Sequence, residues 1–386
     1  MKKIILTVTI LSLSCCAFAK QCFTSAQQRY IYEAGLAAAQ DNEQLTVCLK
    51  ENLKNQTSAA EGSADLASLK KSNNLRSALP EIMNIFKTSK TPSYVFMAAS
   101  AMVSAAGESD VYQKQILDIV NSATAEDYKK TLAVIILVSM DAADGSYIPF
   151  LTPALKASDG GLSAYACGAY AILVPGTLDK YLSQILQLYT FDKVFAQKAF
   201  NATGLSEKAL ISKLKEDFYS PSELLRLGAI EWIGDLGNKK LLLDLLDPQV
   251  DPKEESSTLS AAANALFKNY ALVEEELKKT LKRDPSSQSA TVAVMTYSFL
   301  GSQAYGTIEP LLESGNDNET ANALRVVSFI AGILQKDNTY YANPALEKDR
   351  LMKLIVPVAK ADKNASPKVK PYAQAASKEL YNMLNH

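Results

Sequence analysis

Carboxylates are the side chains of this sequence that could do chemistry, because its single histidine is His386, the last residue. With no second histidine, we expect no histidine-based zinc site, no Ser–His–Asp triad and no Cys–His dyad. The densest acidic run, residues 274–276, precedes Lys278 and Lys279 at the i,i+4 spacing of ion pairs on a helix. This spacing indicates a solvated helix face rather than a general acid and base.

Two further groups of acidic residues fall in predicted loops. They are Asp247, Asp251, Glu254 and Glu255 in one loop, and Asp141 and Asp144 in another. Neither loop has the ligand order and central glycine of calcium-binding loops. The sequence also lacks the glycine-rich phosphate loops and the nucleophile elbow of common enzymes. We therefore expect no metal, no cofactor and no catalysis. One alternative stays open, a periplasmic peptidoglycan or glycan hydrolase that assembles two carboxylates from distant helices.

The elements that would position any site are helices, and residues 220–247 show them most clearly. Ser220 and Pro221 suit an N-cap and a first helical turn, so a helix is predicted to begin there. Apolar residues then recur at three- and four-residue spacing, which places them on one face. They are Leu225, Ala229, Trp232 and Leu236, and Leu224, Leu227, Ile230 and Ile233 widen that face. Gly237 is predicted to end this helix, and a shorter leucine-rich helix follows over residues 241–246.

This helix pair resembles the HEAT-repeat family, in which pairs of helices stack on one another. The residues that carry the resemblance are Pro221, Leu224, Arg226, Ala229, Ile233, Gly234, Leu236 and Gly237. The resemblance implies a right-handed α-solenoid whose curved surface serves binding and not a reaction. A helix pair this apolar cannot bury its own surface, so copies are expected on each side of it.

Related helix pairs are predicted along most of the chain. Helix breaks recur about every 28 to 38 residues, and no sustained strand-like alternation is present. We predict an all-α chain with HEAT-like helical pairs over residues 61–386. Residues 20–60 do not resemble the repeat and are predicted to form an N-terminal helical cap, because the end of a stack needs an atypical outer face.

Residues 1–19 have the three parts of a secretory signal. Lys2 and Lys3 precede the apolar stretch 4–13, and Ala17 and Ala19 form an A-x-A cleavage site. The apolar stretch is much shorter than the roughly 20 residues that a membrane-spanning helix needs. We therefore expect a bacterial periplasmic or secreted protein with no transmembrane segment in the mature chain.

The cysteines fit an oxidising compartment. Cys22 and Cys48 are expected to form a disulfide near the mature N-terminus, with two free thiols as the alternative. Cys15 and Cys16 lie inside the signal, and lipidation of one of them is a less favoured alternative. Cys167 lies in an apolar predicted helix, where a small buried residue is expected.

The expected function is that of a protein-binding or scaffold protein that uses the concave surface of the stack. Candidate contacts are Tyr340 and Tyr341 in a long loop, and Lys239, Lys240, Lys278 and Lys279 in the second helices of successive pairs. Tyrosines in such a loop offer large contact area, or alternatively they pack on the last helices. The lysines would form a basic stripe or, alternatively, an ordinary charged surface. A formal net charge of −1 with interspersed charges argues against nucleic acid as the partner, so a protein of the cell envelope is expected.

Overall fold

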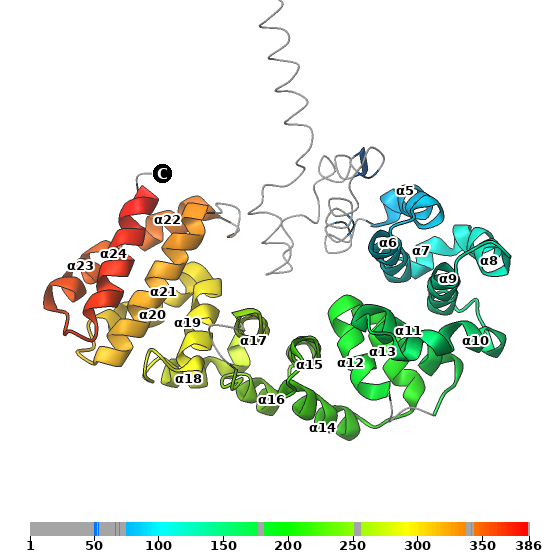
Figure 1. Cartoon of the computed structure of the whole chain (residues 1–386). Coiled ribbons are helices and arrows are strands. Elements are labelled where there is room, and N and C mark those ends of the chain that lie inside the picture. The colour runs from blue at the N-terminus through cyan, green and yellow to red at the C-terminus, as the bar shows by residue number, and fades with distance from the viewer. Residues whose placement is uncertain are drawn as a thin grey trace, which may run out of the picture. The chain divides into compact units, whose positions relative to one another are not determined.

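The computed structural model is helical in every regular element that it describes (Figure 1). The described residues are 50, 51, 53, 66, 69, 75–176, 181–250, 256–336, 341 and 343–384. The prediction of an all-α chain is confirmed for this part of the sequence, and none of its helices is long and apolar enough to cross a membrane. The chain divides into two compact units, Met1–Ala157 and Ser158–His386.

Several sequence predictions concern residues outside this description. They are the signal 1–19 with Ala17 and Ala19, the alternative lipidation sites Cys15 and Cys16, the disulfide cysteines Cys22 and Cys48, most of the cap 20–60, and Tyr340. These remain predictions. The fifth cysteine, Cys167, is fully buried, and burial raises the pKa of its thiol to about 11. It therefore behaves as the small buried residue that the sequence predicts.

The first unit is built around the helix α9. Its helices are α5 (Leu75–Thr88), α6 (Pro92–Ser104), α7 (Ala106–Ser109), α8 (Gln113–Asn121), α9 (Asp127–Ser139) and α10 (Ile148–Leu151), with short 3-10 turns between them. Helices α6, α8 and α10 all pack on α9. Every residue of α9 from Thr131 to Ser139 is buried, which is why this segment is apolar on all sides.

The second unit continues the pattern of paired helices. The first half contains α11 (Gly160–Leu173), α12 (Leu182–Phe191), α13 (Lys193–Thr203), α14 (Glu207–Phe218), α15 (Glu223–Leu236), α16 (Lys239–Asp244) and α17 (Ser256–Lys268). The second half contains α18 (Tyr270–Thr280), α19 (Gln288–Leu300), α20 (Tyr305–Leu312), α21 (Asp317–Lys336), α22 (Pro344–Met352), α23 (Ile355–Asn364) and α24 (Lys370–Leu384).

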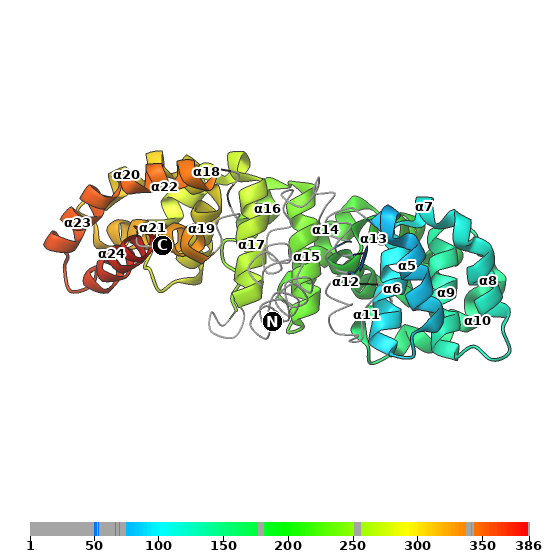
Figure 2. The same ribbon diagram turned by 90° about the horizontal axis from the view of Figure 1, so that it is seen from above.

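Helices of this second unit pack in two rows. In the long row, α15, α17, α19, α21 and α24 each contact the next helix named. In the short row, α14 packs on α15, α16 packs on α18, and α20 packs on α21 and α23. Figures 1 and 2 both show α15 and α17 side by side. A shorter helix returns the chain between successive long ones, so the long helices from α15 to α21 run in the same direction.

The pair α15–α16 agrees with the sequence in most respects but begins later than predicted. Its N-cap is Ser222 rather than Ser220. Gly237 ends α15 with a left-handed φ of 61°, and Asn238 caps α16 by accepting hydrogen bonds from two backbone N–H groups. Leu224 and Leu236, predicted to widen or continue the apolar face, are 40% and 37% exposed. Their spacing is helical, but no neighbouring helix covers those two positions fully.

Two glycines of α15 allow close helix contacts. A Cβ on Gly228 would stand 2.6 Å from the carbonyl oxygen of Leu186 in α12. A Cβ on Gly234 would stand 2.9 Å from the Cβ of Ala265 in α17. Because a real Cβ does not approach other atoms so closely, both positions need glycine if the helices are to keep their separation.

Side-chain hydrogen bonds join some of the helix pairs to a neighbouring pair. The Asn269 side chain donates to the carbonyl oxygen of Gly234 at 2.7 Å, 35 residues away. Arg325 donates to the Thr291 hydroxyl at 2.9 Å, 34 residues away. The Asn322 side chain donates to the carbonyl oxygen of Leu281 at 2.8 Å, 41 residues away. These separations each correspond to about one helix pair, so the bonds hold nearest neighbours together.

Candidate binding surface

The predicted lysine contacts on α18 are ion-paired within their own helix. The Lys278 ammonium lies 2.8 Å from Glu274 and 3.2 Å from Glu275, and Lys279 lies 2.8 Å from Glu276. These hydrogen bonds raise the pKa of both lysines. The positive charge of this segment is therefore balanced locally by the acidic run that precedes it.

The other two candidate lysines lie on α16. Lys239 and Lys240 are exposed, and neither has an ion-pair partner among the described residues. The pKa of Glu276 is lowered mainly by its hydrogen bond from Lys279, and Lys239 also contributes to that lowering. The positive charges of both Lys239 and Lys279 thus act on one carboxylate.

Ion pairs continue along the rest of the short row. Lys213 lies 3.0 Å from Asp217, Lys215 of α14 lies 2.9 Å from Asp244 of α16, and the Lys282 ammonium lies 3.1 Å from Glu319 of α21. These pairs cancel charge locally, and the exposed Lys215–Asp244 pair contributes little energy. The sequence leaves two interpretations of the candidate lysines open, a basic stripe and an ordinary charged surface. These ion pairs match the ordinary charged surface better.

Tyr341 is an internal anchor in the structure. Its ring is 8% exposed, and its hydroxyl donates to the carbonyl oxygen of Ser298 at 2.7 Å. A Cβ on Gly301 would stand 2.8 Å from this ring, so the glycine provides the space that the ring occupies. Little of Tyr341 is therefore available to a partner, and its contacts hold the segment before α22 against the end of α19.

A partly buried polar centre lies beside Tyr341. The Ser302 hydroxyl donates to one Glu347 carboxylate oxygen at 2.6 Å and accepts from the Arg350 guanidinium at 2.8 Å. Tyr305 lies nearby, and burial followed by the negative charge of Glu347 raises the pKa of its hydroxyl. Both hydrogen-bond partners of Ser302 come from α22. Through Ser302, which follows α19, these hydrogen bonds connect α22 to the end of α19.

The other deeply buried acids also have structural partners. Asp192 caps α13 by accepting from the backbone N–H of Phe195 at 2.9 Å. Asp217 accepts from Ser183 and pairs with Lys213; burial raises its pKa more than these partners lower it. Within the described residues, no group of three or more histidine, cysteine, aspartate or glutamate side chains could hold a metal ion. Asp192 and Asp217 thus have structural partners, and neither is identified as a general acid or a general base.

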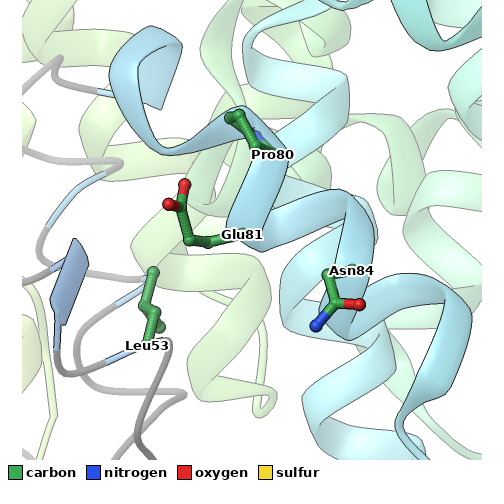
Figure 3. Close-up of a pocket in the computed structure, with 4 residues that line it drawn as sticks. All are labelled: Leu53, Pro80, Glu81 and Asn84. Atoms are coloured by element: carbon green, nitrogen blue, oxygen red, sulfur yellow. The ribbon is translucent and has the colours of Figure 1, made fainter.

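Cavities in the first unit are small. One, of about 250 Å³, lies between Leu53 and the α5 residues Pro80, Glu81 and Asn84 (Figure 3). A second, of about 380 Å³, lies between the end of α5, α8 and the start of α9. Lys129, which lines the second cavity, already donates to the carbonyl oxygens of Lys87 and Ser89. Neither cavity combines an enclosed apolar wall with converging polar groups, as small-molecule sites do.

An aromatic strip on the long row is one surface feature of the second unit. We define the strip as Phe267 on α17, Met295 and Phe299 on α19, and Phe329 and Ile333 on α21. Phe329 is 43% exposed and the other four are partly exposed. The rings of Phe267 and Phe299 meet edge to face with their centroids 6.3 Å apart. Adjacent apolar side chains left open to water are typical of a protein interaction site.

Polar side chains border the strip at the α15 end. Asp235 accepts a hydrogen bond from the Tyr189 hydroxyl at 2.8 Å and from Lys193 at 2.6 Å, and Lys268 stands 4.0 Å away. Burial opposes ionisation of Asp235, but these hydrogen bonds outweigh it and lower the pKa of the carboxyl. Trp232 stacks on Tyr189 beneath this network. Tyr189, Lys193 and Lys268 thus converge on Asp235 at this border.

Sequence reasoning did not identify the strip. The signal was present, because Phe267, Phe299 and Phe329 recur at intervals of about one repeat, each in the later part of a first helix. Periodicity within a helix identifies the apolar face but does not tell which apolar residues the neighbours leave uncovered.

Comparison with known proteins gives no match to a family model and none to a curated protein. The likeness to HEAT repeats therefore rests on the residues of α15 and α16 and on the packing described above.

Proposed function

We propose that this chain is an exported, non-catalytic binding or scaffold protein built as a right-handed α-solenoid of HEAT-like helical pairs. Support for the solenoid comes from the two rows of helices and from hydrogen bonds between neighbouring pairs at two places in the row. In repeat proteins every unit contacts mainly its neighbours, and the stack offers one extended surface for binding.

The HEAT-like character is supported by the local chemistry of α15. Arg226 is buried, and its guanidinium donates to the carbonyl oxygen of Ser220 just before the helix. Gly234 allows contact with α17, and Gly237 reverses the chain into α16. These residues belong to the set that carries the family resemblance, and each has a structural reason to be there.

Export is proposed from the sequence alone, from the signal-like residues 1–19. The partner would then be a protein of the bacterial cell envelope, met in the periplasm or after secretion. Intact-mass measurement of the native protein tests this proposal. A start at Lys20 is expected, whereas an acylated Cys15 or Cys16 would support the lipoprotein alternative.

One observation carries the binding proposal, and it is the aromatic strip. Aromatic side chains dominate the energy of protein interfaces, and exposing them to water has no benefit for a protein that binds nothing. The hydrolase alternative needs two carboxylates across a cleft. Among the buried carboxylates described above, Asp192 caps α13, Asp217 pairs with Lys213, and Glu347 accepts a hydrogen bond from Ser302. No specific observation therefore favours the hydrolase alternative.

Site-specific photo-crosslinking in the producing cell tests the proposed function. A photoreactive residue in place of Phe329 is expected to crosslink one dominant envelope protein. The same residue in place of Glu216, which is 71% exposed on α14, is the matched control. Equal crosslinking from both positions, or none from position 329, would count against the strip as the binding surface.

A further inference from the structure

We infer that helices α22 and α23 dock on an anionic phospholipid surface through one outer face that carries apolar side chains and lysines together. This inference goes beyond the proposed function, because it concerns a different surface from the strip and needs neither export nor a protein partner. It follows from the charge of the C-terminal helices, the exposure of their apolar side chains and the helical spacing of both.

The C-terminal helices carry the opposite charge to the rest of the chain. Residues 344–384 form α22, α23 and α24, and they contain eight lysine and arginine residues against four aspartate and glutamate residues, a net charge of +4. The whole chain has a formal net charge of −1. Two of the four acids are engaged, since Glu347 is buried and Asp362 pairs with Lys370. A local excess of positive charge attracts anionic surfaces.

Exposed apolar side chains concentrate in the same helices. Among the described residues, twelve large apolar side chains are exposed, and five of them lie in this 41-residue segment. The five are Leu346, Met352, Val356, Tyr381 and Leu384. Figures 1 and 2 both show α23 at the outer end of the second unit. The segment thus holds far more than an even share of exposed apolar side chains, which is typical of an interaction surface.

The exposed residues of α22 and α23 share one face. Buried residues recur at positions 347, 351, 354, 358 and 361, a spacing of four and three that continues from α22 into α23. Exposed residues at positions 345, 349, 352, 356, 359 and 363 repeat with the same spacing on the opposite side. We define the outer face as these six exposed residues together with their exposed neighbours Lys353 and Lys360. The apolar residues along its centre are Met352, Val356 and Ala359.

Lysines of the outer face are open to an anionic partner. Lys353 and Lys363 are exposed, and neither has a carboxylate within ion-pair distance among the described residues. Lys360 lies 2.8 Å from Glu313, but both side chains are more than half exposed, so water and salt weaken this pair. The outer face thus has three lysines against a single acid, Asp349.

A phospholipid surface matches both kinds of side chain at once. A polyanion would engage the lysines and leave Met352 and Val356 in water, whereas an apolar protein surface would bury unpaired ammonium groups at a cost. On a phospholipid surface, apolar side chains enter the acyl boundary while lysine side chains extend to the phosphates. The positive charge of the outer face favours anionic over neutral headgroups. The two helices would lie on the surface, since none of the described helices is long and apolar enough to cross a membrane.

Flotation of the mature chain, residues 20–386, with lipid vesicles tests the inference. Vesicles of phosphatidylglycerol and phosphatidylcholine in equal parts are compared with vesicles of phosphatidylcholine alone. Affinity for the anionic vesicles is expected to be at least about tenfold higher, and to fall as sodium chloride rises from about 0.05 to about 0.5 M.

The apolar part of the outer face is tested by Val356→Asp. Val356 is 74% exposed, so the substitution should leave the fold intact and weaken binding to anionic vesicles at least about tenfold. Val194→Asp is the matched control, because Val194 is 76% exposed on α13. Circular dichroism of both variants is expected to match that of the natural protein.

The lysines are tested by a double variant, Lys353→Glu with Lys363→Glu. It should also weaken binding at least about tenfold. The matched control makes the same change of charge at Lys239 and Lys240, which are exposed on α16 and have no ion-pair partner among the described residues. Salt screens distant charges, so this control should change affinity by less than about threefold.

Three results would overturn the inference. One is equal binding to anionic and neutral vesicles, or binding to neither. Another is a loss on lysine reversal with no loss on Val356→Asp, which would indicate electrostatic attraction to any polyanion. The third is an equal loss in the control variants. Photo-crosslinking at position 329 tests the proposed function separately, so the failure of vesicle binding would leave that function standing.

Discussion

The indole of Trp232 stacks on the ring of Tyr189 with their centroids 4.3 Å apart and an angle of 23° between the planes. Trp232 also receives the edge of Phe200 at 5.7 Å and is 3% exposed. One side chain of α15 thus joins α12 and α13, which precede it by about one helix pair.

Replacement of this side chain should be among the most destabilising substitutions in the second unit. Trp232→Ala is expected to lower the free energy of unfolding by about 3–5 kcal/mol, because it leaves a large cavity and removes the stacking on Tyr189. Urea unfolding followed by circular dichroism measures it. The control Tyr219→Ala should change the free energy by less than about 0.5 kcal/mol, and a similarly small effect for Trp232→Ala would contradict the packing described here.

Glycine substitutions separate close helix contact from helix propensity. Gly228→Ala is expected to destabilise by about 1–3 kcal/mol, since the new methyl would stand 2.6 Å from a backbone oxygen of α12. Gly306→Ala in α20 is the matched control, because no atom lies within 4 Å of its added Cβ. That control should stabilise by about 0.5–1 kcal/mol. Thermal unfolding of both variants measures the contrast, and equal effects would refute the close approach of α15 and α12.

Asp235 should make stability depend on pH in the acid range. Its pKa is lower in the folded protein than in the unfolded chain, so its contribution is complete above about pH 4, the unfolded value, and is lost as the pH falls through the folded pKa. Asp235→Asn should therefore cost about 1 kcal/mol at pH 7, a modest figure because the side chain is 31% exposed. The difference should shrink towards pH 2.

Urea midpoints of the natural and Asp235→Asn proteins between pH 7 and 2 measure this contribution. Glu275→Gln, at a 77% exposed side chain, serves as the control and should show little effect at any pH. A gap between Asp235→Asn and the natural protein that stays constant down to pH 2 would exclude the ionised carboxylate as its source.

Tyr341 should behave as an anchor and not as a binding residue. Tyr341→Phe removes the hydrogen bond to the Ser298 carbonyl oxygen but keeps the ring, so a loss of about 1 kcal/mol is expected. Hydrogen exchange of α22 should become faster, whereas crosslinking from position 329 should not change. Loss of the crosslinked partner with unchanged exchange would instead place Tyr341 in the binding surface.

The sequence predicts the helices and their ends better than the surface they form. Gly237 is a predicted helix end and has positive φ at the end of α15, as Gly204 and Gly301 do at the ends of α13 and α19. Such ends are local, because glycine relieves a local steric conflict. Leu224 and Leu236 were assigned to the apolar face by spacing, yet both are exposed, since coverage depends on helices that are distant in sequence.

The candidate binding residues show the same limit. The i,i+4 pair Glu274–Lys278 is present as predicted, but Lys279 pairs with Glu276 at i,i+3 instead of with Glu275. The reason is local rotamer choice, because both spacings place charges within reach on a helix. The strip of Phe267, Phe299 and Phe329 could have been proposed from its recurrence, but its exposure could not, because exposure is a property of three packed helices together.

Because the hydrogen bonds described above join neighbouring helix pairs, bending of the row would occur through small changes at successive junctions. Asn269 bonds to α15, and Arg325 and Asn322 both join α21 to the region of α18 and α19, so a load applied along the row is distributed over these junctions. The Lys368–Asp284 ion pair, 2.9 Å long, is different because it connects residues 84 positions apart. It adds a link between the segments just before α19 and just before α24 that skips the helices between them in the sequence.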